Sequence, residues 1–321
     1  MLLYLAAVAA GLLILAWSSD KFVDGASCLA RITGIPPLVI GMVIIGFGTS
    51  APEMLVSVSA AMNGTPGLAL GNAIGSNIAN IALILGLTAM IVVLPVHSTV
   101  VRREIPLILL AGIFSWVLIR DGSITQFDGI LLILTLFVLL GWMTYAANKQ
   151  HDPVFVEEVN KDTDTKTVSV KHSLFWTFLG LLLLVASSRL LVWGATGIAI
   201  RFGVSDLVIG LTIVAIGTSL PELAASVTSA RKGEVSLAVG NIIGSNLFNN
   251  LGVMGLAAII APFTPPEAVL ARDLPIMLVL TLLIVVFTFT PPKRNIISRW
   301  EAIVLLSIFA AYQLLLYYQS T

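Results

Sequence analysis

Two motifs occur twice in this chain of 321 residues, each time at the same separation. Residues 48–53, Gly-Thr-Ser-Ala-Pro-Glu, return at 217–222 as Gly-Thr-Ser-Leu-Pro-Glu, 169 positions later. Residues 71–77, Gly-Asn-Ala-Ile-Gly-Ser-Asn, return at 240–246 with the same offset, which also relates 103–106 to 272–275. A fixed offset between several segments indicates an internal duplication, so the chain should fold as two related halves.

Long apolar runs fill most of each half. The chain is 58% hydrophobic and only 11% charged, and about 20 mostly apolar residues suffice for one membrane-spanning helix. The sequence therefore predicts an all-α integral membrane protein with ten transmembrane helices. The predicted spans are 2–19, 36–62, 67–91, 104–119, 127–147, 174–193, 204–230, 235–260, 273–290 and 300–318.

The predicted organisation is a first repeat at 1–147, a polar linker at 148–173 and a second repeat at 174–321. Each repeat holds five spans, an odd number, so the second must enter the membrane from the opposite side to the first. The two five-helix repeats are therefore inverted. Many secondary transporters use inverted repeats with interrupted helices to build a midplane site that opens alternately to either side. No segment fits the nucleotide-binding domain of a pump, and no enzyme is predicted.

The basic residues predict how the chain is oriented. Thirteen fall in one set of alternate loops: Lys21, Arg31, Arg102, Arg103, Lys149, Lys161, Lys166, Lys171, Arg231, Lys232, Lys293, Arg294 and Arg299. Four fall in the opposite set: Arg120, Arg189, Arg201 and Arg272. Because basic loops stay on the cytoplasmic side, we expect a cytoplasmic linker and both termini outside. With no targeting peptide evident, the expected location is the inner (plasma) membrane of a prokaryote.

Two acidic residues stand apart from the other fifteen. Glu53 and Glu222 are predicted deep within the second and seventh spans, whereas the rest, Asp20 and Asp24 included, are predicted in loops or near span ends. A charged carboxylate at that depth costs at least ~2.5 kcal/mol, and no Lys or Arg is predicted mid-span to pair with it. The compensating positive charge must then come from a ligand.

Oxygen atoms surround both glutamates in the predicted spans. Pro52 and Pro221 should each free the carbonyl four residues earlier, at Gly48 and Gly217. Polar side chains repeat every four residues on the third and eighth spans: Asn72, Ser76 and Asn80, then Asn241, Ser245 and Asn249. The glycine pairs Gly71/Gly75 and Gly240/Gly244 should let these helices approach their neighbours closely. Hard oxygen ligands favour Ca²⁺ or Na⁺ over zinc or copper.

Charge balance favours exchange. Two ionised glutamates give the site a charge of −2, which one Ca²⁺ or two Na⁺ would neutralise, while an empty site would be a buried dianion. If the protein can turn its site from one side of the membrane to the other only while bound ions balance the charge of the site, an ion moving one way must be replaced by another moving back. The residues therefore predict antiport.

The paired motifs and the inverted halves resemble the sodium/calcium exchanger family of the calcium/cation antiporter superfamily, in its short prokaryotic form with two alpha-repeats. The resemblance implies exchange of Na⁺ for Ca²⁺ by alternating access, three Na⁺ per Ca²⁺, and sliding of the first and sixth spans across the other eight. Asparagine at 249, where some relatives have an aspartate associated with potassium dependence, makes potassium co-transport less expected.

The resemblance also implies a set of ion ligands. Glu53 and Glu222, with the backbone carbonyls of Thr49 and Thr218, would bind Ca²⁺ centrally. The flanking Na⁺ sites would use Ser50, Ser76, Ser219 and Ser245 with the carbonyls of Gly46 and Ala215, and Asn80 and Asn249 would face each other at the centre. The expected partners are the two ions and membrane lipid, with no cofactor, no nucleic acid and no obligate protein partner.

Other functions fit parts of the pattern. In a Ca²⁺/H⁺ antiporter, protonation of Glu53 or Glu222 would replace Na⁺ binding, because buried carboxylates can have raised pKa values. A passive cation channel would conduct without a counter-ion and would need no inverted symmetry. An intramembrane protease could use two carboxylates as a dyad, but oxygen-rich surroundings suit cation binding better. Asn77, Asn246 and Asn250 are the polar residues of these spans for which simple helix-to-helix hydrogen bonding is most expected.

Overall fold

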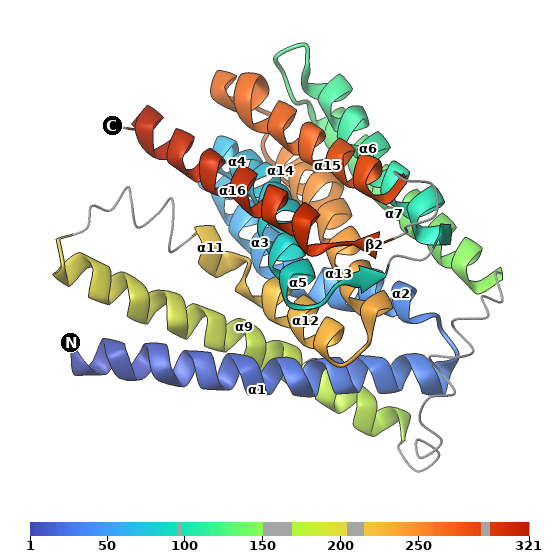
Figure 1. Ribbon diagram of the computed structural model, residues 1–321. Helices are drawn as coiled ribbons and strands as arrows, with labels where there is room; N and C mark the ends of the chain where they lie inside the picture. Colours follow the sequence, from blue (N-terminus) through green and yellow to red (C-terminus); the bar gives the residue numbers. More distant parts are fainter. Residues whose placement is uncertain (96–97, 150–168, 204–214, 290–295, 321) are drawn as a thin grey trace.

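A computed structural model describes residues 1–95, 98–149, 169–203, 215–289 and 296–320 (Figure 1). The first half contains α1 (Leu2–Thr33), α2 (Pro37–Val39), η1 (Ile40–Ile45), α3 (Gly46–Met62), α4 (Pro66–Ile78), η2 (Ala79–Ile84), α5 (Leu85–Ile91), β1 (Leu94–Pro95), α6 (Ser98–Ile119) and α7 (Gln126–Lys149). The second half contains α9 (Val170–Arg201), α11 (Ala215–Thr218), α12 (Leu220–Arg231), α13 (Val235–Leu247), η5 (Phe248–Val253), α14 (Met254–Ile260), η6 (Val269–Asp273), α15 (Leu274–Phe289), β2 (Ile296–Ile297) and α16 (Arg299–Ser320).

Eight helical stretches among the described residues are long and apolar enough to cross a membrane. A further helix, α6, covers the predicted fourth span, and α11 with α12 covers the described part of the seventh. Residues 204–214 of the predicted seventh span and 150–168 of the predicted linker lie outside the described residues. Large apolar side chains such as Leu13, Phe137 and Phe178 are exposed on the outer helices. Such a surface suits contact with lipid rather than water.

Helices α1 and α9 are much longer than predicted. Each has 32 residues, or about 48 Å of helix, whereas the sequence analysis ended the first span at residue 19 and the sixth at 193. The predictions that Lys21 lies in a loop and that Asp20 and Asp24 lie in a loop or near the end of a span are therefore wrong, and Arg189 likewise lies well inside α9. The helix continues because Phe22, Val23 and Ala26 bury their side chains completely while the charged residues point outward.

The α1–α9 pair extends the internal duplication to the first and sixth spans. The two helices lie side by side and antiparallel along one side of the bundle (Figure 1). A Cβ added to Gly11 would lie 2.9 Å from Leu191 Cβ, and one added to Gly180 would lie 2.7 Å from the Phe22 backbone nitrogen. The offset of 169 relates Gly11 to Gly180 and Phe22 to Leu191, so the same contact is made twice in opposite directions. This is the symmetry of an inverted pair.

The third and eighth spans form the centre of the molecule. They are the most buried of the eight candidate spans, and α1 and α9 are among the least buried. In both central spans the helix widens into a π-helical segment, η2 after α4 and η5 after α13, again 169 residues apart. Asn80 and Asn249 are the second residues of these segments. Single π turns inside α-helices occur frequently at functional sites.

Small residues let the eighth span approach the second closely, as predicted. A Cβ added to Gly240 would lie 2.5 Å from the Leu38 carbonyl oxygen, and one added to Gly244 would lie 2.2 Å from that of Met42. The residues related by the offset to Leu38 and Met42 are 207 and 211, outside the described residues, so the prediction for Gly71 and Gly75 stays a prediction.

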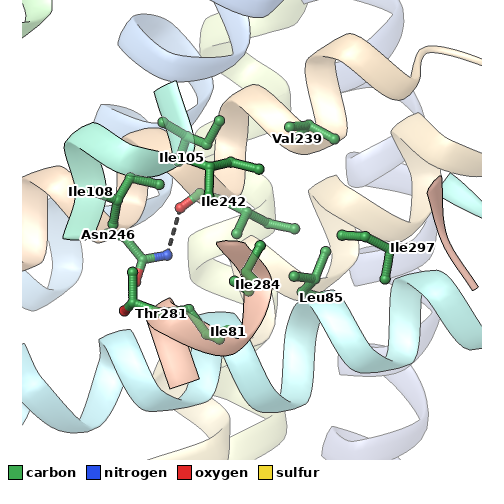
Figure 2. Close-up of a pocket in the computed structure, with 11 residues that line it drawn as sticks. Ile81, Leu85, Ile105, Ile108, Val239, Ile242, Asn246, Thr281, Ile284 and Ile297 are labelled. Atoms are coloured by element: carbon green, nitrogen blue, oxygen red, sulfur yellow. Dashed lines mark hydrogen bonds between the residues drawn. The ribbon is translucent and has the colours of Figure 1, made fainter. Parts of the chain in front are cut away.

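Two smaller features complete the core. Strands β1 and β2 pair antiparallel, Leu94 with Ile297 and Pro95 with Ile296. Beside them an apolar pocket of about 30 Å³ is lined largely by isoleucines from η2, α6, α13, α15 and β2 (Figure 2). Asn246 lies at its edge and donates a hydrogen bond to the carbonyl of Ile242 at 2.7 Å, within its own helix. Asn77 donates to Met277 Sδ at 3.5 Å. Both asparagines thus have structural partners.

Candidate ion-binding site

Glu53 and Glu222 both lie in the interior of the bundle. Glu53 is on α3 and Glu222 is on α12, and each residue is only 1% exposed. Both carboxylate oxygens of Glu53 and one of Glu222, Oε2, have no hydrogen-bond partner among the described residues. Buried polar atoms are almost always paired, and a carboxylate most of all. These oxygens therefore present an incomplete site that a cation could fill.

The two prolines beside the glutamates shape the backbone differently. Pro52 lies inside a continuous α3. Pro221 lies in the first turn of α12, and Ser219 separates α12 from the short helix α11. Glu222 consequently lies in the first turn of α12, at the positive end of the helix dipole, which stabilises a carboxylate there. An interrupted helix next to an ionisable group is the form predicted for a transport site.

Hydrogen bonds across the two halves join several predicted site residues. Ser50 Oγ donates to Glu222 Oε1 at 3.3 Å. Thr49 Oγ1 donates to Asn241 Oδ1 at 3.2 Å and lies 3.4 Å from Ser245 Oγ. Ser245 Oγ in turn donates to the carbonyl of Gly46 at 3.5 Å. The structure thus gathers α3 of the first half with α12 and α13 of the second.

Asn72 and Asn241 have a structural role that the sequence analysis did not distinguish. Asn72 Nδ2 donates to the carbonyl of Glu53 at 3.3 Å and to Ser57 Oγ at 3.2 Å. Asn241 Nδ2 makes the equivalent bonds, to the carbonyl of Glu222 at 3.2 Å and to Ser226 Oγ at 2.8 Å. Each asparagine therefore fixes the backbone of the glutamate in its own half.

Asn80 and Asn249 differ from that pair. They are 1% and 0% exposed, and within the part of the chain that the structure describes neither the amide nitrogen nor the amide oxygen of either has a hydrogen-bond partner. The segment η2, which carries Asn80, packs on α12, and η5, which carries Asn249, packs on α3. Each unpartnered amide is thus on a segment that contacts the helix bearing the other half's glutamate.

The remaining predicted ligands take varied positions. Ser219 and Ser76 are buried, and Ser219 Oγ has no hydrogen-bond partner in the described part of the chain. Thr218 lies on α11 next to a cavity, and Ala215 begins α11. The Gly217 carbonyl, predicted to be free, accepts a hydrogen bond from Ser188 Oγ of α9 at 2.7 Å. That prediction is wrong for Gly217, because α9 passes close enough for a serine to replace the bond that Pro221 removes.

The two faces of the bundle differ where α1 and α9 meet the motif helices. Helix α1 packs along α12, and charged pairs close that end: Lys232 Nζ lies 2.6 Å from Asp24 Oδ1 and 3.3 Å from Asp20 Oδ1, and Arg31 lies 2.5 Å from Glu234 Oε1. Ser27 also donates to Glu234, at 2.6 Å. We call these contacts the α1 ion-pair cluster.

The repeat-related interface, between α9 and α3, contains two cavities. One, of about 240 Å³, is lined by residues that include Pro52, Gly217, Thr218 and Pro221, next to both glutamates in sequence. The other, of about 380 Å³, is lined by residues that include Ser59, Asn63 and Thr65 at the end of α3. Both cavities share Val56 and Arg189 in their linings, and we call the two neighbouring cavities together the passage.

Comparison with known proteins identifies the family. The model of the family described as sodium/calcium exchanger protein matches residues 3–145 and again residues 172–318. The chain belongs to the sodium/calcium exchanger family. The family is one of ion exchangers rather than enzymes, and this chain accordingly is an integral membrane transport protein.

Several relatives of this exchanger cover nearly its whole length. CaxA of Alkalimonas amylolytica, described as an antiporter, is 45% identical over 97% of both chains. The inner membrane protein YrbG of Escherichia coli K12 is 38% identical, covering 100% of this chain and 98% of that protein. The sodium/calcium exchanger MaX1 of Methanosarcina acetivorans is 29% identical, covering 96% of this chain and 97% of that one.

A solved structure of the sodium-calcium exchanger NCX_Mj, soaked with 10 mM Na⁺ and no Ca²⁺, matches with a TM-score of 0.83 at 31% identity over 97% of both chains. Together with the helices described above, this match confirms the predicted fold class: an all-α membrane protein of ten transmembrane helices in two inverted five-helix repeats.

Proposed function

We propose that this protein is a secondary active antiporter that exchanges Na⁺ for Ca²⁺ across the membrane by alternating access. The observation that carries the proposal is the pair of buried glutamates, of whose four carboxylate oxygens three lack a partner in the described ranges of the chain. Oxygen ligands in this number and charge suit Ca²⁺, or Na⁺ ions in its place. The similarity to MaX1 and NCX_Mj, both named sodium/calcium exchangers, supports the same ion pair.

We propose the following ligands for these ions. Glu53 and Glu222, with the carbonyls of Thr49 and Thr218, bind Ca²⁺. Ser50, Ser76, Ser219 and Ser245, with the carbonyls of Gly46 and Ala215, complete the Na⁺ sites, and Asn80 and Asn249 lie between them. The mutual burial of Ser50, Thr49 and Glu222, and the unpartnered amides of Asn80 and Asn249, support this assignment.

The test is Ca²⁺ uptake into vesicles that contain the purified protein. We expect uptake when an outward Na⁺ gradient is imposed and none when only a proton gradient is imposed. Uptake with the proton gradient alone would instead establish a Ca²⁺/H⁺ antiporter. Glu53→Gln and Glu222→Gln should abolish uptake, whereas Glu267→Gln, the same change at an exposed residue, should leave it intact. Normal exchange by either site variant would refute the ligand assignment.

We also propose that the protein lies in the inner membrane of a prokaryote, with the linker cytoplasmic and both termini outside. The distribution of basic residues supports this orientation, and the relative YrbG is named an inner membrane protein. Cysteine labelling provides the test. In a Cys28→Ala background, Asn160→Cys should react with a membrane-impermeant maleimide only after the cells are opened. Reaction in intact cells would reverse the proposed orientation.

A further inference from the structure

Arg189 occupies an unexpected place for a basic residue in a cation carrier. It lies on α9, is exposed, and lines both cavities of the passage between α9 and α3. The inner cavity also contains Pro52 and Pro221, each of which directly precedes a site glutamate. A cation that approaches the site through this passage must therefore pass a guanidinium group, which is always charged.

The charge at this place is opposite to the charge at the repeat-related place. The offset of 169 relates Arg189 on α9 to Asp20 on α1. Asp20 belongs to the α1 ion-pair cluster, where Asp20 and Asp24 share the single ammonium group of Lys232. The two carboxylates and one ammonium group leave a net charge of −1 there, against +1 at Arg189. The duplication has thus placed unlike charges at equivalent points of the two faces.

The electrostatic energy of an ion near a fixed charge is proportional to the valence of the ion. A potential that lowers the local concentration of Na⁺ by some factor therefore lowers that of Ca²⁺ by the square of that factor. One unit charge about 6 Å away in water changes a monovalent ion's concentration about threefold, and a divalent ion's about tenfold. A charged group in a passage thus selects ions by valence without contacting them.

We propose that Arg189 is a valence-selecting residue of the passage, disfavouring the approach of Ca²⁺ relative to Na⁺ from this face, and that Asp20 and Asp24 do the reverse at the opposite face. This inference rests on the proposed exchange of Na⁺ for Ca²⁺. Ca²⁺ then binds more readily from the face of the α1 ion-pair cluster, and Na⁺ competes more effectively from the face of the passage.

The experiment uses the full-length protein in membrane vesicles of known sidedness, right-side-out and inside-out, at low ionic strength. The measured quantities are the KM for Ca²⁺ in isotopic Ca²⁺/Ca²⁺ exchange and the inhibition constant of Na⁺ on the same side. Ca²⁺ self-exchange requires only that Ca²⁺ be carried, so it remains measurable even if the driving ion is not Na⁺. In that case the Na⁺-driven uptake described above fails, while the test of Arg189 still gives a result.

For Arg189→Gln we expect the KM for Ca²⁺ to fall about tenfold and the Na⁺ inhibition constant about threefold, with kcat unchanged and on one face only. Arg189→Lys should behave as the wild type. Arg201→Gln is the matched control, because Arg201 ends the same helix about 18 Å along its axis, a distance at which a unit charge in water changes the local concentration of a divalent ion only about twofold. Choline chloride at high concentration should remove the difference between Arg189→Gln and wild type.

Three results would overturn the inference. One is an unchanged KM for Ca²⁺ in Arg189→Gln. Another is an equal change for Na⁺ and Ca²⁺, which would indicate a steric or structural effect. The third is an effect that persists at high ionic strength, or one that Arg189→Lys shows as well as Arg189→Gln. Either result is expected if the guanidinium instead makes a specific contact with a lipid phosphate.

Discussion

At the scale of single residues, the site contains two kinds of polar side chain: those with hydrogen-bond partners in the protein and those without them in the described residues. The amides of Asn72 and Asn241 already bond the backbone of the glutamates, whereas those of Asn80 and Asn249 have no partner among the residues that the structure describes. The family resemblance placed Asn80 and Asn249 at the ion site, but the spacing of the four asparagines in two equivalent stripes gives no role to Asn72 and Asn241. Only the packing of α4 on α3 and of α13 on α12 assigns the first pair a positioning role.

Loss of the Asn241 amide should disturb the site without removing a ligand. Asn241→Ala leaves the Glu222 carbonyl and Ser226 Oγ without their donor, and we expect the free energy of unfolding to fall by about 1–3 kcal/mol. Because Glu222 is then less well fixed, the KM for Ca²⁺ should rise by about tenfold. Thermal unfolding in detergent and uptake kinetics measure the two effects. Asn63→Ala, at an exposed asparagine, is the control, and an equal effect there would refute the role of Asn241.

At the scale of elements, the pairing of α1 with α9 depends on positions where only glycine fits. A side chain at residue 180 would meet the backbone of Phe22, whereas one at Gly141 of α7 meets nothing within 4 Å. The prediction of ten spans did not contain this pairing, because hydropathy locates a helix but does not say which helix it will touch.

The same substitution at these two glycines should therefore give opposite results. Gly180→Val forces α1 away from α9 and should destabilise the protein by about 1–3 kcal/mol, with a matching fall in yield. Gly141→Val, on an exposed surface of α7, should be tolerated. Size-exclusion profiles and thermal unfolding of the two purified variants measure the difference. Equal stability of the two variants would contradict the packing of α1 on α9.

The α1 ion-pair cluster can be examined with the cysteine that the chain already contains. Cys28 lines a cavity of about 240 Å³ together with Asp24, Arg31, Lys232 and Glu234. If these charges hold that end of the bundle closed, Glu234→Gln should increase the rate at which a water-soluble maleimide labels Cys28, and Lys232→Ala should do the same more weakly, because its pairs are more exposed. Labelling at the wild-type rate in both variants would show that the cluster does not restrain this end.

At the scale of the whole molecule, the burial of two carboxylates is a source of instability that a bound cation should offset. Ca²⁺ at one hundred times its dissociation constant should raise the free energy of unfolding by about 2.7 kcal/mol. A chelator should reverse the resulting rise in Tm, and Mg²⁺ should not replace Ca²⁺, because it gives up its waters reluctantly. Thermal unfolding in detergent measures the shift. Glu53→Gln and Glu222→Gln should abolish it, and an unchanged shift in both would place the ion elsewhere.

Much of this architecture could be predicted from the sequence, and the exceptions have physical causes. The constant offset predicted two related halves, the odd number of spans in each half predicted their inversion, and the isolated acids predicted Glu53 and Glu222 at the centre. The predicted length of α1 was wrong because a hydropathy argument ends a span at Asp20, although charged residues can continue a helix when they face outward and pair with Lys232. The face that contains the passage could not be predicted, because two equivalent halves give the sequence no preferred side.

The two glycine contacts of the α1–α9 pair carry a mechanical consequence. Leu191 packs against Gly11, and Phe22 packs against Gly180. Displacement of either helix along the other by one turn, about 5.4 Å, would bring larger side chains to both contacts, where they would clash with the main chain of the neighbouring helix. We therefore expect the two helices to travel as a single rigid body. Because each is about 48 Å long, longer than the ~30 Å hydrocarbon layer, their travel should depend on bilayer thickness, and lipid chain length should set the turnover rate.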